Sequence, residues 1–584
     1  MYTSSWCAYV LALAVLPRLV LAAPIPATVA PPTLSSSRTT KPKKGGVKLP
    51  FLRRRVVGRQ TTQDDDVLGG TVGLGDNADL FYTVAVTVGD STTSVNLDTG
   101  SSDLWVMSDA CKTTQCQRST AKPYDVTKSF KPTDNASVQL QYGDSVSGTH
   151  ASGPVGRDTV TLAALTLKDQ TLAAVDDTDN SAVQNGGAGI MGLGFPAQSF
   201  VQAAAINAEF NNPSGTDTFI EQTANYGPAV SRLILADMID DPLFAVTLQR
   251  NTIDVSGQGE ITIGQLPDEI DESNITWVPV RLYDPAEGGM AAPSFAPNEK
   301  YPLRWEVPID AVFLDGQKLP TSTQSGAGLD TSIISGLIDT GNSLIRGPQD
   351  VVNNIYTKVS PAFAANSNSD PTLPCDAGHN LAFQIGGKMF PVDPRDFVSQ
   401  NKQGDASTCI ANNIVGTDAP SSGALFSWNL GDPFLKSNMV VFYYGNLTHP
   451  SVDPPRIGFV SLVPQNADDL LDDAVDDAQG AGGNFESKAD AAPTASSLIL
   501  ETSSGASSSA ASRTSSPSST TSSSSPASTA KPQSSSTASG SAPAESTSSS
   551  SNAAPPSLRL PPLLGAWPSL LFVSLSMLSS LCIL

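Results

Sequence analysis

A chain of 584 residues is too long for a single domain, so regions of different character are expected along it. Ten of its 34 Lys and Arg lie in residues 1–59, which leaves 24 basic against 56 acidic residues, a net charge near −32, in the remainder. This balance argues against nucleic acid as a partner, because contacts with phosphates need clustered Lys and Arg.

Two segments precede the region of globular composition. Residues 1–22 are predicted to be a signal peptide, because the uncharged apolar run 8–16 leads to Val20-Leu21-Ala22, a small-residue cleavage site. Residues 23–59 are predicted to be a basic propeptide, with Arg53-Arg54-Arg55 as a processing site. We therefore expect the chain to enter the secretory pathway.

Residues 60–464 have the sequence pattern of a mostly β protein. Residues 80–88 alternate apolar and polar side chains, Gly89-Asp90 supplies a turn and residues 92–97 alternate again, which predicts a hairpin. Four more segments show strand patterns: 153–167, 259–263, 277–282 and 439–444. One segment, 200–210, shows a helical pattern. We expect two lobes, over residues 60–270 and 271–464.

Asp-Thr-Gly occurs once in each predicted lobe. Asp98-Thr99-Gly100 ends the first hairpin, and Asp339-Thr340-Gly341 also follows apolar residues. A second repeated element follows each motif, at residues 189–194 and 428–435, and each copy has a glycine at the end of an apolar segment. Two carboxylates held close together cannot both ionise, so one can accept and the other donate a proton. The duplication predicts one active site made from two halves.

Four cysteines fall in the predicted globular region. An even number in a secreted chain predicts two disulfides, Cys111–Cys116 and Cys375–Cys409. A zinc site is disfavoured because no paired His or Cys-x-x-Cys spacing accompanies them, and no metal or cofactor is expected. Three N-glycosylation sequons suit the same compartment: Asn135, Asn274 and Asn446.

Two further segments follow the globular region. Residues 465–556 are predicted to be an acidic and then Ser/Thr-rich disordered stalk, because the Ser/Thr tract buries too little apolar surface to offset its chain entropy. Small residues around Asn552 and the apolar tail within 557–584 predict a GPI-attachment signal. The alternative is a retained spanning helix, for which about 20 apolar residues suffice. A GPI anchor would place the protein on the extracellular face of the plasma membrane or in the cell wall.

Taken together, these residues resemble the pepsin-like aspartic proteases over about residues 81–462. The most specific match is 95–106, in which an apolar residue precedes Asp-Thr-Gly-Ser-Ser and Leu-Trp-Val follows. Gln141-Tyr142-Gly143-Asp144 resembles the flap, a hairpin that folds over the substrate. The order of signal, leader, two lobes, stalk and tail is similar to that of the fungal cell-surface yapsin-type subgroup.

The resemblance implies a bilobal pepsin-like fold with its active site in the cleft between the lobes. It implies that Asp98 and Asp339 hold a lytic water, without a cofactor. It also assigns supporting roles to their neighbours: Thr99 and Thr340 cross-link the loops, Gly100 and Gly341 allow tight turns, Ser101 bonds to Asp98, Trp105 positions Tyr142, Tyr142 and Gly143 cover the scissile bond, and Ile190 lines a side-chain pocket.

The second motif departs from the family at Asn342, where Thr or Ser is usual. An amide can still donate to Asp339, so activity is expected in spite of this departure. The sequence predicts an aspartic endopeptidase that acts on peptides at acidic pH, and we expect it to be a monomer. The alternative is a catalytically inactive, wall-bound binding or structural protein of the same fold. The leader lysines either hold a zymogen inactive or belong to a disordered processing segment: Lys41, Lys43, Lys44 and Lys48.

Overall fold

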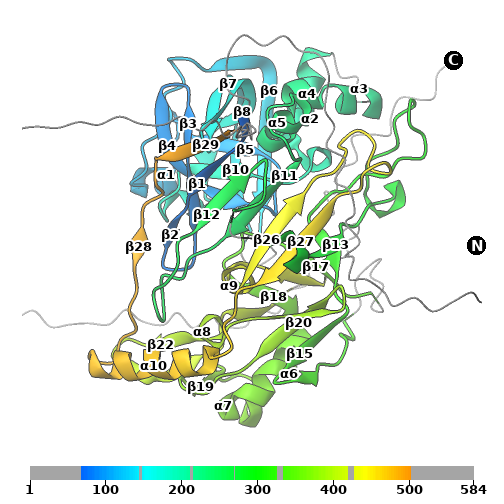
Figure 1. Cartoon of the computed structure of the whole chain (residues 1–584). Coiled ribbons are helices and arrows are strands. Elements are labelled where there is room, and N and C mark those ends of the chain that lie inside the picture. Colours follow the sequence, from blue (N-terminus) through cyan, green and yellow to red (C-terminus); the bar gives the residue numbers. More distant parts are fainter. Residues whose placement is uncertain are drawn as a thin grey trace, which may run out of the picture. The chain divides into compact units, whose positions relative to one another are not determined.

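The structure is a computed structural model that describes residues 67–143, 148–210, 215–268, 270–324, 333–417 and 427–500 (Figure 1). The predicted signal peptide and propeptide, the tract beyond residue 500, Asn552 and the GPI signal lie outside the described residues. Within the described ranges, no helix has both the length and the apolar character needed to cross a membrane.

The largest sheet, of ten strands, carries the first aspartate motif. Its strands are, in spatial order, β28 (Ala489–Asp490), β2 (Gly75–Asn77), β3 (Tyr82–Val88), β4 (Ser91–Asp98), β10 (Gly189–Gly192), β5 (Leu104–Met107), β8 (Leu165–Val175), β7 (Thr149–Leu162) and β6 (Lys131–Tyr142), with β9 (Asp177–Thr178) paired to β7. The predicted hairpin is confirmed as β3 and β4, with Gly89 in the turn at a φ of 55°. Its alternation arises because one face of β3 packs into the core.

Three smaller sheets form the second half. A five-stranded sheet carries the second motif: β14 (Glu306–Pro308), β17 (Ser335–Ile338), β25 (Trp428–Leu430), β18 (Ile345–Pro348) and β24 (Ile414–Thr417). The other two sheets are β16 (Gln317–Lys318), β15 (Ala311–Leu314), β20 (Leu381–Ile385) and β21 (Lys388–Pro391), and β19 (Thr372–Pro374), β23 (Asp405–Ile410) and β22 (Ser399–Lys402).

A seven-stranded sheet joins the two halves. Its order is β13 (Thr276–Pro279), β27 (Arg456–Ser461), β26 (Asn438–Tyr443), β11 (Leu243–Thr247), β12 (Glu260–Ile263), β1 (Val67–Gly73) and β29 (Ser496–Leu500). Phe244 of β11 lies opposite Phe442 of β26, and the two rings stack with their centroids 4.7 Å apart. The mostly β, bilobal prediction is correct, but the boundary at residue 270 divides strands that share one sheet.

The helices are short and cover the sheets. The predicted helix at 200–210 is present as α2, whereas α6 and α10 were not predicted. Over the described ranges the helices are α1 (Thr114–Arg118), α2 (Phe200–Glu209), α3 (Thr216–Glu221), α4 (Thr223–Tyr226), α5 (Ala229–Leu235), α6 (Gln349–Val359), α7 (Pro361–Ala365), α8 (Pro394–Phe397), α9 (Asp432–Ser437) and α10 (Ala467–Gly480), with single 3-10 turns at Ser181–Val183, Pro196–Gln198, Glu272–Asn274 and Pro285–Glu287.

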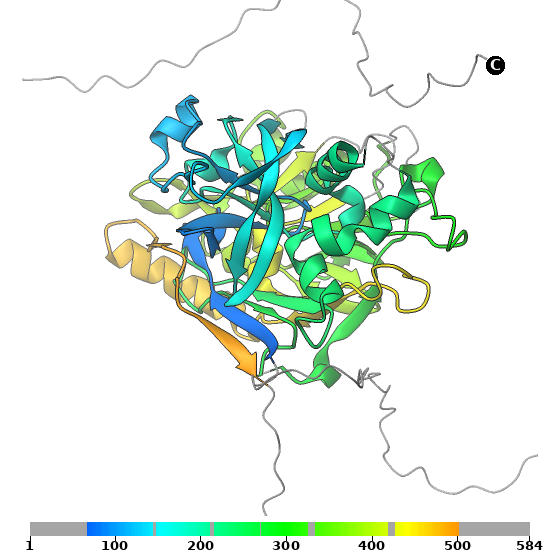
Figure 2. The same ribbon diagram turned by 90° about the horizontal axis from the view of Figure 1, so that it is seen from above.

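The prediction of a disordered stalk from residue 465 is wrong for the segment 467–500. The acidic run forms α10, which packs against α8 and β23. Its buried residues recur at helical spacing: Ala467, Leu471, Val475 and Ala478. The chain then returns to the first half, where β28 pairs with β2 and β29 pairs with β1. The orange strand β29 lies beside the blue strand β1 in both views (Figures 1 and 2). The globular unit therefore includes this C-terminal segment.

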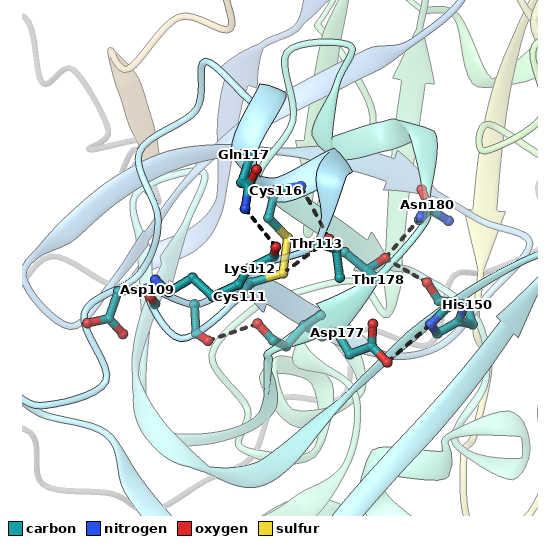
Figure 3. Close-up of a disulfide and its surroundings, with 12 residues drawn as sticks. Asp109, Cys111, Lys112, Thr113, Cys116, Gln117, His150, Asp177, Thr178 and Asn180 are labelled. Atoms are coloured by element: carbon teal, nitrogen blue, oxygen red, sulfur yellow. Dashed lines mark hydrogen bonds and ion pairs between the residues drawn. A yellow bond between two sulfur atoms is a disulfide. The ribbon is translucent and has the colours of Figure 1, made fainter.

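Both predicted disulfides are present, Cys111–Cys116 and Cys375–Cys409. Figure 3 shows the first, which spans the N-terminal turn of α1. The sequon residues Asn135 and Asn274 are exposed and Asn446 is half-buried. Glycosylation at these positions stays a prediction.

Candidate active site

The two Asp-Thr-Gly loops have the same setting in their sheets. β10 runs parallel beside β4, so that Gly192 lies opposite Asp98. β25 runs parallel beside β17 in the same way, and Asp339 follows β17 directly. In each half a third strand pairs with the other edge of this neighbouring strand: β5 pairs with β10, and β18 pairs with β25. Corresponding positions of the two loops are 241 residues apart, as Thr99 and Thr340 are.

Reciprocal hydrogen bonds tie the two loops together. The Thr99 hydroxyl donates to the carbonyl of Ile338 at 2.7 Å and accepts from the amide of Thr340 at 3.0 Å. The Thr340 hydroxyl donates to the carbonyl of Leu97 at 2.8 Å and accepts from the amide of Thr99 at 3.1 Å. Both threonines are 1% exposed, so these bonds are shielded from water. The structure thus brings the two halves together at the positions that the sequence singled out.

Each aspartate accepts hydrogen bonds on both carboxyl oxygens. The amide of Gly100 lies 2.8 Å from Oδ1 of Asp98, and the Ser101 hydroxyl donates to Oδ2 at 2.5 Å. The amide of Gly341 lies 3.0 Å from Oδ1 of Asp339. Its Oδ2 accepts from Nδ2 of Asn429 at 2.7 Å. Both carboxyls are therefore held in fixed orientations.

The motif glycines let the two carboxyls face each other. A Cβ built on Gly100 would lie 2.5 Å from Oδ1 of Asp339, and one built on Gly341 would press against the Asp98 carboxyl in the same way. Real Cβ atoms do not approach oxygen so closely. Glycine is required because any side chain here would occupy the space of the opposite carboxyl.

Burial raises the pKa of both aspartates. For Asp98, which is 5% exposed, burial and then the charge of Asp339 raise the pKa to about 7. For Asp339, which is 8% exposed, burial raises the pKa, and the hydrogen bonds from Asn429 and Gly341 act in the opposite direction. A pair in these surroundings retains one proton over a range of pH and can act as acid and base together.

Tyr142 ends β6, beside the turn of the β6–β7 hairpin. Nε1 of Trp105, which is fully buried, donates to the Tyr142 hydroxyl at 2.8 Å. Ile190 is 4% exposed and lies opposite Trp105 between β10 and β5. Gly143 has a φ of 80°, which begins the turn, and residues 144–147 lie outside the described part of the chain. The flap role of Tyr142 and Gly143 and the pocket role of Ile190 stay predictions.

The expected contact between Asn342 and Asp339 is wrong. Asn342 Nδ2 donates its two hydrogens to the carbonyl of Leu344 at 2.6 Å and to Oδ1 of Asn429 at 2.9 Å. Its own Oδ1 accepts from Nε of Arg346 at 3.2 Å. The donor to Asp339 is Asn429, which sequence reasoning missed. An asparagine inside the apolar segment Trp428-Asn429-Leu430 was the available signal, because the corresponding position of the first half is Ile190.

Comparisons with known proteins agree with this geometry. The model of the eukaryotic aspartyl protease family matches residues 81–449. The chain is 26% identical to an aspartic protease of Phaffia rhodozyma over 401 residues, which are 68% of this chain and 80% of the relative. It is 29% identical to rhizopuspepsin-4 of Rhizopus niveus over 374 residues, 63% of this chain and 76% of the relative. It is also similar to the major aspartyl peptidase 1 of Cryptococcus neoformans, with 26% identity over 408 residues, 68% of this chain and 71% of the relative.

Proposed function

The chain belongs to the eukaryotic aspartyl protease family, and from this premise we propose that it is an aspartic endopeptidase that hydrolyses peptide bonds at acidic pH. One observation carries the proposal: each half contributes one buried carboxyl, and the reciprocal bonds of Thr99 and Thr340 hold the two together. Each of these carboxyls also accepts a backbone amide and a side-chain donor. Such a pair has the groups that peptide hydrolysis needs.

In the proposed reaction, a water molecule lies between Asp98 and Asp339. The ionised carboxylate takes a proton from the water as its oxygen attacks the peptide carbonyl carbon, and the protonated carboxyl gives its proton to the carbonyl oxygen. The tetrahedral intermediate then collapses as the C–N bond breaks: the carboxyl that took the proton from water gives it to the amine nitrogen, and the other carboxylate takes a proton from a hydroxyl of the intermediate, which restores the starting pair. Sharing of one proton between two carboxyls is the behaviour for which aspartic proteases are the standard example.

The pH dependence follows from the need for one proton on the pair. The pKa of Asp98 is raised to about 7, so the pair loses its second proton as the pH passes this value. Above it both carboxyls are ionised and the acid is missing. Activity is therefore expected at acidic pH and is expected to fall above about pH 7.

Cleavage of a denatured protein by leader-free enzyme tests the proposal. We expect cleavage at acidic pH, inhibition by pepstatin, and loss of cleavage in Asp98→Asn. Asp109→Asn is the matched control, because Asp109 is exposed and lies outside the site. Absence of cleavage by correctly folded, leader-free protein would reject the endopeptidase.

The alternative, a catalytically inactive protein of the same fold, was suggested by Asn342, where the family usually has Thr or Ser. Asn429 supplies the hydrogen bond to Asp339 that the departure at Asn342 put in doubt. We therefore favour the enzyme over a wall-bound binding or structural protein.

We also propose that the enzyme is a monomeric, secreted, yapsin-type protein with a GPI anchor near Asn552, made as a zymogen whose basic leader is removed. The support is the order of segments along the sequence. Release from membranes by a phospholipase C that cleaves GPI anchors is the expected result. Protein that stays in the membrane after this treatment would favour the retained helix instead.

A further inference from the structure

A continuous series of hydrogen bonds leads from Arg346 to the second aspartate. Arg346 Nε donates to Oδ1 of Asn342 at 3.2 Å, and Asn342 Nδ2 donates to Oδ1 of Asn429 at 2.9 Å. Asn429 Nδ2 then donates to Oδ2 of Asp339 at 2.7 Å. Arg346, Asn342 and Asn429 are half-buried, and Arg346 lies opposite Asn429 across β18 and β25. Two adjacent strands and one loop therefore build the series.

The chemistry at its two ends fixes the direction of the series. A guanidinium only donates hydrogen bonds, and an ionised carboxylate only accepts them. If the amide of Asn342 were reversed, its NH2 would face the NH of Arg346. If the amide of Asn429 were reversed, its oxygen would face the carboxylate of Asp339. Both amides are thus held with their NH2 groups toward Asp339, and hydrogen bonds aligned in this way polarise one another.

In the first half, a different residue donates the side-chain hydrogen bond to the aspartate. In the strand registers, Ser101, Trp105 and Ile190 correspond to Asn342, Arg346 and Asn429. There the Ser101 hydroxyl reaches Asp98 directly, and the neighbouring strand supplies only an apolar side chain. In the second half the loop residue does not bond to the carboxyl, and the neighbouring strand supplies the donor.

We infer that Arg346, Asn342 and Asn429 form a one-way relay in which Asn429 is the positioning residue of Asp339 and favours its ionised form. The inference rests on the proposed function, because it identifies Asp339 as the base toward water. The Ser101 hydroxyl can donate or accept, so Asp98 accommodates the shared proton, whereas Asn429 Nδ2 can only donate. In agreement, burial and the charge of Asp339 raise the pKa of Asp98 to about 7. Burial also raises the pKa of Asp339, but the bond from Asn429 and the charge of Arg346 oppose this.

The key variant is Asn429→Ile, which gives the second half the residue that the first half has at Ile190. Loss of a hydrogen bond to the charged carboxylate raises the pKa of the base, so the acidic limb of the kcat/KM profile moves to higher pH by about 1 to 2 pH units. We expect kcat to fall about 10- to 100-fold and KM to change less than about 2-fold, because both polar atoms of the Asn429 amide are engaged by Asn342 and Asp339.

The double variant Asn342→Ser/Asn429→Ile is the rescue. It recreates the serine and isoleucine arrangement of the first half, so most of the lost kcat should return and the acidic limb should move back. The control is Asn413→Ile, because Asn413 is also half-buried and donates to two carbonyls, those of Asp396 and Val398. It should leave the acidic limb in place.

Carboxyl 13C NMR titration of the same leader-free proteins provides a readout that needs no turnover. Asn429→Ile should raise the apparent pKa of the first ionisation of the pair by about 1 pH unit or more. If Asn429→Ile does not fold, Asn342→Ala removes the preceding bond from the loop and should cause a smaller shift in the same direction. An unchanged titration, or a folded double variant without recovery, would overturn the relay. A wild-type protein that cleaves nothing would reject the proposed function, and the titration would still decide the relay.

Discussion

Thr99 and Thr340 each place a hydroxyl on the backbone of the other's loop, with four hydrogen bonds of 2.7 to 3.1 Å between two segments 241 residues apart. The two carboxyls depend on this link for their mutual position, because each aspartate directly precedes one of the threonines. The geometry of the pair is therefore a property of both halves together.

Thr340→Val should weaken both the fold and the site. The change keeps the shape of the side chain but leaves the amide of Thr99 and the carbonyl of Leu97 buried without this partner. Each unsatisfied group costs about 1–3 kcal/mol, so we expect the free energy of unfolding to fall by about 2–4 kcal/mol in urea titrations. Thr87→Val is the control, because its bond to Thr92 is exposed, and it should change stability by less than about 0.5 kcal/mol.

Gly100→Ala should reduce activity by on the order of 100-fold. The added Cβ would lie 2.5 Å from Oδ1 of Asp339, so the carboxyls must separate, and a displacement of about 1 Å costs on the order of 100-fold in rate. Single-turnover cleavage rates measure this effect. Gly480→Ala at the end of α10 meets no atom within 4 Å and should cleave at the wild-type rate. A Gly100→Ala enzyme that cleaves at the wild-type rate would mean that the carboxyls do not face each other as described.

The fold should be more stable at pH 5 than at pH 8. Burial, and next the charge of Asp79, raise the pKa of Asp76 to about 8, and the pKa of Asp98 is raised to about 7. Folded carboxyls with raised pKa values bind protons that the unfolded chain has lost, so stability falls as pH rises from about 4 to these values, by up to about 1.4 kcal/mol per pH unit and group.

Asp76→Asn isolates one of these contributions. The amide cannot ionise, so the decline of Tm between pH 5 and pH 8 should be smaller than in the wild type. Asp237→Asn, at an exposed position, should retain the wild-type slope. Equal slopes in Asp76→Asn and the wild type would show that Asp76 does not titrate in this range.

The C-terminal segment should contribute to folding. Leu471 of α10 is fully buried, so Leu471→Ala should reduce the free energy of unfolding by about 2–5 kcal/mol. Leu498→Ala in β29 is the matched control, because Leu498 is 44% exposed and should lose less than about 1 kcal/mol. Equal, small losses would return α10 to the stalk that the sequence predicted.

Local patterns in the sequence were sufficient for the β3–β4 hairpin, for α2 and for the two Asp-Thr-Gly loops. They were not sufficient for pairings between distant segments. Asn429 and Asn342 are 87 residues apart, and alternation does not reveal which strand lies beside which. The strand β29 reads as part of a polar tract and becomes ordered by pairing with β1, at the other end of the described chain. For α10 the signal was present, but the acidic composition obscured the helical spacing of Leu471 and Val475.

The most direct test of the central claim is the rate at which leader-free Asp339→Asn cleaves a denatured protein at acidic pH, beside the wild type and Asp109→Asn. If water is activated between Asp98 and Asp339, the Asp339→Asn rate should fall by at least about 1,000-fold while the protein keeps its Tm, and Asp109→Asn should match the wild type. A folded Asp339→Asn protein that cleaves at a rate close to that of the wild type would contradict a two-aspartate site.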